Sequence, residues 1–241
     1  MYKMVGFFLV CTLGAASPVI AKEPRENPAL APLLEILQSE ETGRDSFLFA
    51  DVVFEATGKR MLPGDSPAAM PFIDQLAEVV AGVVREFNEA EENPIKGRRI
   101  NEGSSYFEDA ILEKIRELPG WKADFPKTAQ GREQRSGYPD IRAVAPDGAI
   151  FYLDPKLHKA DSKTSSFRTF YYEPKTGTNK INDDAVHLLV GIGHNGGEGG
   201  KFQIVYWNLM DLSKLRVGLK AEFQASNREM YQEEKLLRSS E

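Results

Sequence analysis

The sequence contains few of the residues that disulfide scaffolds and zinc sites require. Only one of its 241 residues is a cysteine, Cys11, and three are histidines. Neither a disulfide framework nor a structural zinc site is therefore expected. Its 20 glycines and 14 prolines are an ordinary share, which excludes collagen-like and low-complexity chains. Positive charge is also in short supply, because 30 Lys and Arg stand against 36 Asp and Glu, so any nucleic-acid site must be a local patch.

A long apolar run occurs only at the N-terminus. Lys3 precedes an apolar stretch over residues 4–16, and small residues lead to a cleavage position after Ala21. This layout is typical of a secretory signal peptide, and the run is too short for a good membrane-spanning helix. We therefore expect a signal peptide at residues 1–21, a secreted or periplasmic protein, and no membrane contact after cleavage. An ordinary N-terminal core helix is the alternative.

A change of hydrophobic period organises the rest of the chain. Apolar residues at helical spacing predict helices from residue 32 to 38, from 72 to 91 and from 104 to 118. After Gly137 the period becomes two, which predicts strands at 140–145, 149–157, 167–172, 185–192 and 202–209, before a last helix at 227–237. This order indicates an α/β fold with a mixed central sheet flanked by helices. We expect a helical extension over 22–100 and the α/β domain over 101–241, while 41–68 gives no clear pattern.

The most informative segment is a predicted hairpin around Pro146-Asp147-Gly148. These residues suit a type I turn followed by a glycine in the left-handed region. With this three-residue loop, the antiparallel register places Asp140 opposite Asp154. Lys156 lies two residues further along, and hence on the same face of the sheet. A two-residue loop would instead place Asp140 opposite Leu153.

Two carboxylates on directly opposed residues repel each other unless a cation lies between them. Mg²⁺ accepts oxygen ligands, needs only one or two carboxylates, and keeps its other positions for water and phosphate. Lys156 beside the pair could position an attacking water or stabilise the charge that develops on a phosphate. A ladder of Asp and Lys side chains on a solvated sheet is the alternative.

Glu108 occupies a position where a carboxylate is costly. On a helical wheel of residues 104–118 it falls inside the apolar arc of Phe107, Ile111 and Ile115. A core-facing carboxylate must be paired or coordinate something. Glu108 is therefore a candidate for the same site, and half of a buried structural salt bridge is the alternative.

These features together resemble the PD-(D/E)xK nuclease superfamily, the fold of many restriction endonucleases. The motif here is Pro139-Asp140, then Asp154-Pro155-Lys156, and the resemblance covers residues 104–209. It implies an endodeoxyribonuclease in which Asp140 and Asp154 bind Mg²⁺ or Mn²⁺ and Lys156 is the catalytic lysine. It also implies that Glu108 is a further metal ligand or a neighbouring acid. Pro155 departs from the pattern, because proline lacks the N–H used in strand pairing, so we expect the strand to be unpaired there.

The segment that follows the motif is locally basic. Residues 155–180 contain six Lys or Arg against two acidic residues, together with hydroxyl side chains. Such side chains hold nucleic acids through their backbone phosphates. We therefore expect DNA as the partner, contacted after the motif by Lys159, Lys163, Ser165, Ser166 and Arg168, and before it by Lys127, Arg132 and Arg135. The aromatic residues within 167–172 fit either this surface or the protein core.

One glycine motif is set aside. Gly191, Gly193 and Gly196 match the spacing of a dinucleotide-binding fingerprint. A strand rather than a helix follows them, so no helix N-terminus is available to hold a pyrophosphate. We interpret the segment as a loop between strands.

The sequence favours a secreted or periplasmic, metal-dependent endonuclease that acts on DNA, and three alternatives stay open. The first is a nuclease-like fold without activity that binds DNA or a protein. The second is a glycosidase that uses Asp140 and Asp154 as its carboxylate pair. The third applies if residues 1–21 are not a signal peptide, and is a cytoplasmic type II restriction endonuclease.

Overall fold

The computed structural model describes residues 28–39, 47–92, 94–95, 100–164, 170–197, 202–220, 224–230, 232–233 and 237–238. The predicted signal peptide at residues 1–21 lies outside these ranges. The chain divides into two units, Met1–Ser39 and Glu40–Glu241. The first unit contains helix α1 (Leu30–Gln38), which confirms the expected short helix and buries none of its residues. Within the described residues, no helix combines the length and the apolar character needed to cross a membrane.

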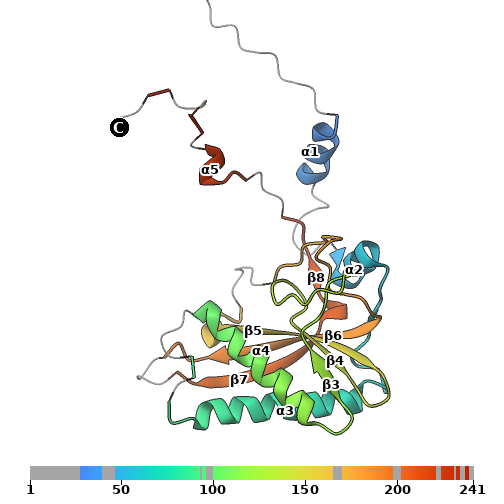
Figure 1. Cartoon of the computed structure of the whole chain (residues 1–241), viewed down its shortest axis with the longest axis vertical. Coiled ribbons are helices and arrows are strands. Elements are labelled where there is room, and N and C mark those ends of the chain that lie inside the picture. Colours follow the sequence, from blue (N-terminus) through green and yellow to red (C-terminus); the bar gives the residue numbers. More distant parts are fainter. Residues whose placement is uncertain are drawn as a thin grey trace, which may run out of the picture. The chain divides into compact units, whose positions relative to one another are not determined.

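The second unit is built on a mixed sheet of six strands (Figure 1). Its antiparallel part consists of β3 (Lys122–Asp124), β4 (Ile141–Val144) and β5 (Ile150–Lys159). Next to β5 runs the parallel strand β6 (Ala185–His194). Two further strands pair with β6, namely β2 (Met61–Leu62) in parallel and β7 (Ile204–Asp211) in antiparallel orientation. The expected mixed α/β sheet is confirmed.

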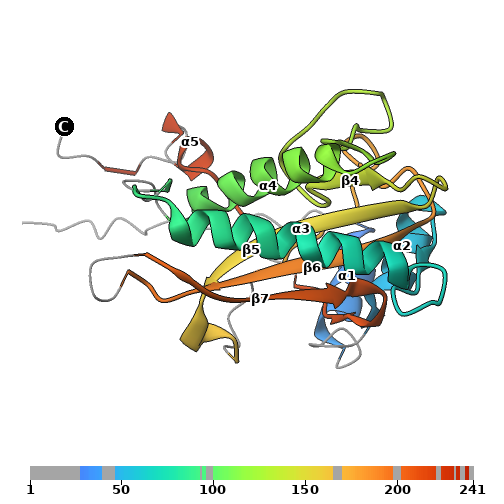
Figure 2. The ribbon, with the colours of Figure 1, turned by 90° about the horizontal axis from the view of Figure 1, so that it is seen from below.

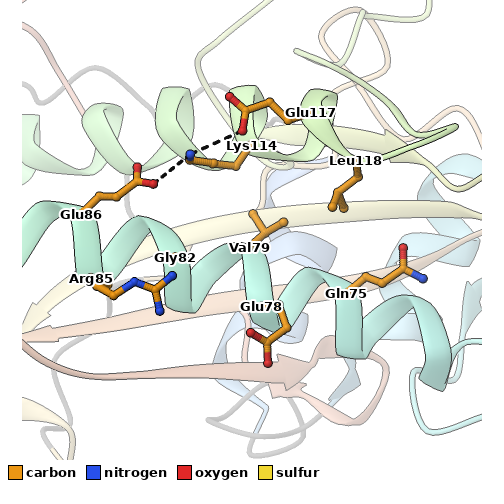
Figure 3. A pocket seen from close by; sticks show the side chains of 9 residues that line it. All are labelled: Gln75, Glu78, Val79, Gly82, Arg85, Glu86, Lys114, Glu117 and Leu118. Atoms are coloured by element: carbon orange, nitrogen blue, oxygen red, sulfur yellow. Dashed lines mark ion pairs between the residues drawn. The ribbon is translucent and has the colours of Figure 1, made fainter.

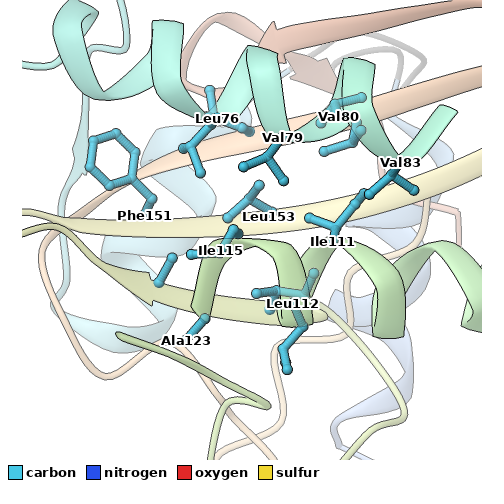
Figure 4. Close-up of a cluster of buried hydrophobic side chains, with 14 of the residues drawn as sticks. Leu76, Val79, Val80, Val83, Ile111, Leu112, Ile115, Ala123, Phe151 and Leu153 are labelled. Atoms are coloured by element: carbon cyan, nitrogen blue, oxygen red, sulfur yellow. The ribbon is translucent and has the colours of Figure 1, made fainter. Parts of the chain in front are cut away.

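Two long helices cover one face of this sheet (Figure 2). They are α3 (Met70–Glu89), with a proline in its first turn, and α4 (Ile100–Glu117), and both match predicted helices. Their apolar stripes meet Phe151 and Leu153 of β5 in the main core (Figure 4). The helical side of this core is formed by Leu76, Val79, Val80, Val83, Ile111, Leu112 and Ile115.

A smaller apolar cluster packs on the opposite face of the sheet. Helix α2 (Phe49–Thr57) contributes Phe49, whose ring makes edge-to-face contacts with Tyr138, Phe170 and Tyr172 at centroid distances of 5.4, 5.0 and 5.2 Å. Phe170 and Tyr172 therefore belong to the core. On β5 this cluster ends at Tyr152. The next residues on the same face of β5 are Asp154, Lys156 and His158.

The remaining elements are short. Strands β1 (Phe47–Leu48) and β8 (Arg216–Val217) form a separate antiparallel pair. Two 3₁₀ turns follow long strands, η2 (Ala160–Ser162) after β5 and η4 (Leu212–Lys214) after β7.

The structure differs from the expected elements in three places. Residues 170–172 form no strand, because the rings of Phe170 and Tyr172 pack against Phe49, and 167–169 lie outside the described residues. The final helix is limited in the described residues to α5 (Asn227–Met230), since this charged segment has no apolar stripe to bury. The boundary between the two units falls after Ser39 instead of residue 100, because α3 needs the sheet to bury its apolar side chains.

Candidate active site

The predicted hairpin between β4 and β5 positions the site. Its loop is Pro146-Asp147-Gly148, with the glycine in the left-handed region at a φ of 92°. Strand pairing extends to Ile141 opposite Leu153, so the preceding residue, Asp140, comes next to Asp154. The three-residue loop and its register are confirmed, and the alternative with a two-residue loop is excluded.

Asp140, Asp154 and Lys156 form one ionic cluster on this face. Nζ of Lys156 lies 2.7 Å from Oδ2 of Asp154 and 3.5 Å from Oδ2 of Asp140. Asp154 is 1% exposed and Asp140 is 8% exposed. Oδ2 of Asp154 is ion-paired with the lysine, but it accepts no hydrogen bond of good geometry from the described residues. A buried carboxylate oxygen in this state has capacity for a further cation.

The two ionisable neighbours of Asp154, Asp140 and Lys156, both have a raised pKa, with different consequences for their charge at neutral pH. Burial, and after it the charge of Asp154, raise the pKa of Asp140 to about 7, although Lys156 acts in the opposite direction. Burial lowers the pKa of Lys156, but the two carboxylates outweigh this effect and raise it above its ordinary value. Lys156 therefore stays an ammonium at neutral pH, while Asp140 can exchange a proton near pH 7.

Pro155 fits into the strand without losing a hydrogen bond. The backbone N–H of Asp140 donates to the Leu153 carbonyl at 3.1 Å, so Leu153 directs its backbone groups toward β4. Because alternate residues point to the same neighbour, Pro155 also faces that side, where β4 has already ended. Toward β6 the register continues, with Pro155 opposite Val190. The expected gap in pairing therefore concerns only the β4 side, and Asp154 and Lys156 keep their alignment.

Glu108 faces the cluster from α4. Its side chain is 14% exposed, and its carboxylate lies 3.4 Å from the guanidinium of Arg135. Burial and then the charge of Asp140 raise the pKa of Glu108, whereas Arg135 lowers it. The neighbouring Asp109 lies closer to Arg135, at 2.8 Å, but is 55% exposed. Glu108 therefore lies near Asp140, as expected for a carboxylate of the site, and it also forms a salt bridge with Arg135. Both roles stay predictions.

Lys180 is a member of this site that the sequence analysis did not single out. It is 1% exposed, and its Nζ donates to the backbone carbonyl of Gln134 at 3.1 Å. Burial lowers the pKa of Lys180, while the charges of Asp140, Asp154 and Glu108 act to raise it. The residue comes from an irregular segment before β6, where no hydrophobic period marks a buried side chain. Its flanking asparagines, which are typical of turns, are the only local signal.

Lys180 is part of a clamp between two irregular segments. The backbone N–H of Ala129 donates to the carbonyl of Asn179 at 3.0 Å. Nδ2 of Asn182 donates to the carbonyl of Lys127 at 2.7 Å. With the contact from Lys180 to Gln134, these bonds fix residues 127–134 beside the carboxylates. The basic loop that the sequence predicted as a DNA contact is therefore held against the site.

The predicted DNA-contacting residues fall into three groups. Lys127 and Arg132 are exposed on the clamped loop. Arg135, Lys159 and Lys163 have partners within the chain: Arg135 binds Glu108 and Asp109, Lys159 binds Asp161 at 2.9 Å, and Lys163 lies over the Tyr206 ring at 4.9 Å. Ser165, Ser166 and Arg168 lie outside the described residues.

The donor set fits a hard divalent cation. Asp140 and Asp154 offer carboxylate oxygens side by side, one of them the buried Oδ2 described above. In the described part of the chain, no group of three acidic or histidine side chains is arranged to hold a metal ion. Two carboxylates with positions left for water and phosphate match the preference of Mg²⁺. A direct bond from Glu108 to the metal stays a prediction.

A histidine lies in the core. His187 is fully buried, and its Nδ1 lies 2.6 Å from the hydroxyl of Tyr138. Burial lowers the pKa of His187 to about 3, so the ring is neutral at physiological pH.

A groove between α3 and α4 is separate from this site (Figure 3). Its central cation, Lys114, is neutralised by Glu86 at 2.8 Å and by Glu117 at 3.4 Å. None of the residues predicted for catalysis or DNA binding lines it. The carboxylate cluster on the other face of the sheet is therefore the candidate site.

The fold and the carboxylate–lysine cluster define a class of protein, the restriction-endonuclease-like α/β proteins. The profile of the Type II restriction enzyme MjaV family matches residues 42–234, and the chain belongs to this family. A relative, the Type II restriction enzyme MjaV of Methanocaldococcus jannaschii, is 29% identical over 218 residues, which cover 85% of this chain and 92% of the relative. No solved structure matches the chain.

Proposed function

We propose that this chain is a divalent-metal-dependent endonuclease that hydrolyses phosphodiester bonds of DNA, with its active site at Asp140, Asp154 and Lys156. The observation that carries the proposal is the cluster itself, in which one ammonium lies 2.7 and 3.5 Å from two buried carboxylates. Membership of a family of restriction enzymes supports DNA as the substrate. The resemblance to PD-(D/E)xK nucleases gives each residue the same role.

Asp140 and Asp154 would hold Mg²⁺ or Mn²⁺. When bound, such an ion supplies a Lewis acid that polarises a phosphate oxygen and makes a water molecule more acidic. The protein contributes the orientation of the two carboxylates, which the hairpin register fixes. It also contributes burial, which raises the pKa of Asp140 to about 7 and favours neutralisation by a cation.

Lys156 acts on the reacting phosphate rather than on the metal. Its ammonium is kept charged by the two carboxylates, so it can donate hydrogen bonds to a phosphate oxygen or orient the attacking water. The side chain is 33% exposed, which leaves its end open to a substrate. Glu108 is a second acid near Asp140, and Arg135 limits its movement.

The arrangement favours phosphodiester over glycoside chemistry. A retaining glycosidase needs two carboxylates that face each other across a sugar. Here the ammonium of Lys156 is ion-paired with both carboxylates, an arrangement that suits the negative charge of a phosphate better than a neutral sugar. An inactive nuclease fold stays the second candidate, because the same cluster could persist as structure.

The family favours an intracellular restriction role over secretion, since a secreted enzyme cannot screen DNA inside the cell. We therefore propose the cytoplasmic alternative for the location. Mass spectrometry of the N-terminus of the protein isolated from its own cells tests this point. A chain that begins at Lys22 would restore the secreted nuclease, and an uncleaved N-terminus supports the cytoplasmic enzyme.

The proposal is tested by incubating the purified full chain with supercoiled DNA in the presence of Mg²⁺ or EDTA. Nicking or linearisation should require Mg²⁺. Asp154→Asn keeps the side chain's size but removes its charge. It should lower the rate by more than about 100-fold, since removing even an indirect partner of a metal costs 10–100-fold. Asp74→Asn, an exposed aspartate on α3, is the matched control and should cleave normally.

Three outcomes would contradict the assignment. Equal cleavage in EDTA removes the metal from the reaction. Cleavage by Asp154→Asn at the wild-type rate removes this carboxylate from the site. Binding of DNA without cleavage in any divalent cation favours the inactive fold.

A further inference from the structure

The face of the sheet that carries the proposed active site continues past it as an ordered row of side chains. The register aligns Lys156 of β5 with Gly191 of β6 and Asn208 of β7. Two residues further along β5, it aligns His158 with Gly193 and Tyr206. The two rows lie on the same face, about 6.6 Å apart along the strand. The His158 row is therefore the nearest neighbour of the catalytic lysine in the direction of η2.

His158 and Tyr206 form a fixed pair over a glycine. Nε2 of His158 lies 2.6 Å from the Tyr206 hydroxyl, and the ring centroids are 5.6 Å apart. A Cβ atom at Gly193 would lie 2.3 Å from Cζ of Tyr206, so the tyrosine ring rests directly on this backbone. A glycine is needed at this position because any side chain would displace the ring.

The pair has a hydrogen-bond donor to spare. A neutral histidine carries one N–H and tyrosine carries one O–H, and the contact between them uses only one of these two hydrogens. Either Nδ1–H of His158 or O–H of Tyr206 therefore remains as a donor. Both residues are only partly buried, so this donor can reach a ligand.

Lys163 adds a positive charge to the pair. Its Nζ lies over the Tyr206 ring at 4.9 Å from the centroid. The ring thus has both the Gly193 backbone and an ammonium next to it. The ammonium keeps its three N–H donors, because a cation–π contact uses none of them.

We propose that His158, Tyr206 and Lys163 form a phosphate-binding subsite for the DNA strand that is cleaved, holding a phosphodiester next to the one at Lys156. The chemistry is a charge from Lys163 and one neutral donor from the His158–Tyr206 pair. The subsite fixes the register of the strand on the sheet. It rests on the proposed function, because Lys156 defines which phosphate is its neighbour.

The test measures binding of the full chain to a labelled DNA duplex in EDTA at several salt concentrations, so that cleavage plays no part. Lys163→Gln should weaken binding and reduce the slope of log K against log [salt] by about one, as expected for one lost phosphate contact. Tyr206→Phe keeps the ring and the cation–π contact but removes the hydroxyl. It should weaken binding about two- to tenfold without changing the slope, as expected for one neutral hydrogen bond.

Lys214→Gln is the matched control. Lys214 is an exposed lysine that follows the other end of β7 and is paired with Asp65, so both affinity and slope should stay at wild-type values. An unchanged slope for Lys163→Gln would overturn the subsite. Wild-type binding by Tyr206→Phe together with weak binding by Tyr206→Leu would show base stacking instead, and would also overturn it.

The two proposals fail in different experiments. If Asp154→Asn cleaves normally, the active site is wrong, whatever the binding data show. If Asp154→Asn is inactive while Lys163→Gln and Tyr206→Phe bind as wild type, only the subsite is wrong. Once the cut position is mapped, the flanking phosphate can be replaced by a neutral methylphosphonate. This replacement should lower the DNA affinity of the wild-type chain more than that of Lys163→Gln. Equal losses of affinity would contradict the contact between Lys163 and this phosphate.

Discussion

The two faces of the central sheet differ in their side chains, although the same strands form both: one face is apolar and the other carries charged residues. On β5, Phe151 and Leu153 face α3 and α4 and are fully buried among apolar side chains. Tyr152, Asp154 and Lys156 face the other way, where an apolar cluster gives way to charges after one residue. Alternation along a single strand thus separates an apolar core from a face that carries buried charges.

The contrast indicates where stability comes from and where the proposed active site lies. The core face gains free energy from apolar burial, with no charge to desolvate. The other face buries Asp140 and Asp154, and burial raises the pKa of Asp140, which costs stability in the absence of a metal. Variants on the two faces should therefore have opposite effects on stability and activity.

The largest loss of stability is expected on the core face. Phe151→Ala removes a fully buried ring that contacts Trp121 and Phe72. It should lower the free energy of unfolding by about 3–5 kcal/mol. The melting temperature should fall by about 6–20 °C, at 2–4 °C per kcal/mol. Val205→Ala, at an exposed position of β7, is the control and should change stability by less than about 0.5 kcal/mol. Equal effects of the two changes would show that α3 and α4 do not seal this face.

On the charged face, removing a carboxylate should raise the free energy of unfolding, and the size of this gain should depend on pH. The folded-state pKa of Asp140 is about 7, against 3.8 for the free side chain. The folded state therefore holds a proton that the unfolded chain releases, and this contribution to stability is lost as pH rises from about 4 to 7. By 1.36 kcal/mol per pH unit, the loss is on the order of 4 kcal/mol.

Asp140→Asn removes this dependence. In EDTA at pH 8, denaturant titrations should find the variant more stable than the wild type, with the difference vanishing near pH 4. Saturating Mg²⁺ should stabilise the wild type, by about 2.7 kcal/mol at 100 times its dissociation constant, and should leave the variant unchanged. A variant that is less stable at pH 8 would mean that the carboxylate serves the fold rather than a metal.

A smaller contrast lies within α4, between two neighbouring acids that share Arg135. Glu108→Gln should lower the cleavage rate about 10–100-fold, as expected for a residue that supports a metal site. Its melting temperature should hold or rise, because repulsion with Asp140 is relieved. Asp109→Asn changes an exposed ion pair, so stability should move by less than about 1 kcal/mol and activity should stay normal. A large fall in melting temperature for Glu108→Gln, with an unchanged response to Mg²⁺, would make Glu108 half of a structural salt bridge.

The smallest expected effect compares two glycines on β6. Gly193→Ala places a Cβ 2.3 Å from the Tyr206 ring, so the tyrosine must move away from His158. Overpacking of this kind costs about 1–3 kcal/mol, and the low end applies because the end of a side chain can move. Gly191→Ala meets nothing closer than 3.8 Å and should be neutral. DNA affinity should fall for Gly193→Ala but not for Gly191→Ala. Equal affinities of the two variants would mean that the His158–Tyr206 pair does not contribute to DNA binding.

Local patterns in the sequence were sufficient for much of the site. In the turn Pro146-Asp147-Gly148, a three-residue loop places the glycine in the left-handed region. This loop length sets the strand register that brings Asp140 next to Asp154. The helical period of α4 was enough to place Glu108 on the inner face. Both inferences succeed because the interactions that determine them are only a few residues apart.

Other parts could not be predicted because distant segments decide them. The segment around Phe170 was predicted to be a strand, yet Phe170 and Tyr172 pack against Phe49, more than 100 residues earlier in the chain. The period of α3 predicted a helix but not its partner, so the helix was assigned to a separate extension.

The sequence by itself determined the period of the long helices α3 and α4 and of the strands β4 to β7, the hairpin register, and the cluster of Asp140, Asp154 and Lys156 on one face. These follow from backbone geometry, which repeats every 3.6 or 2 residues. The tertiary structure alone decided that Lys180 is buried beside those carboxylates and that Tyr206 lies over Gly193 next to His158. Both depend on which irregular segments and strands pack together, because burial of a charge or a ring is set by all the neighbours at once and not by the residues beside it in the chain.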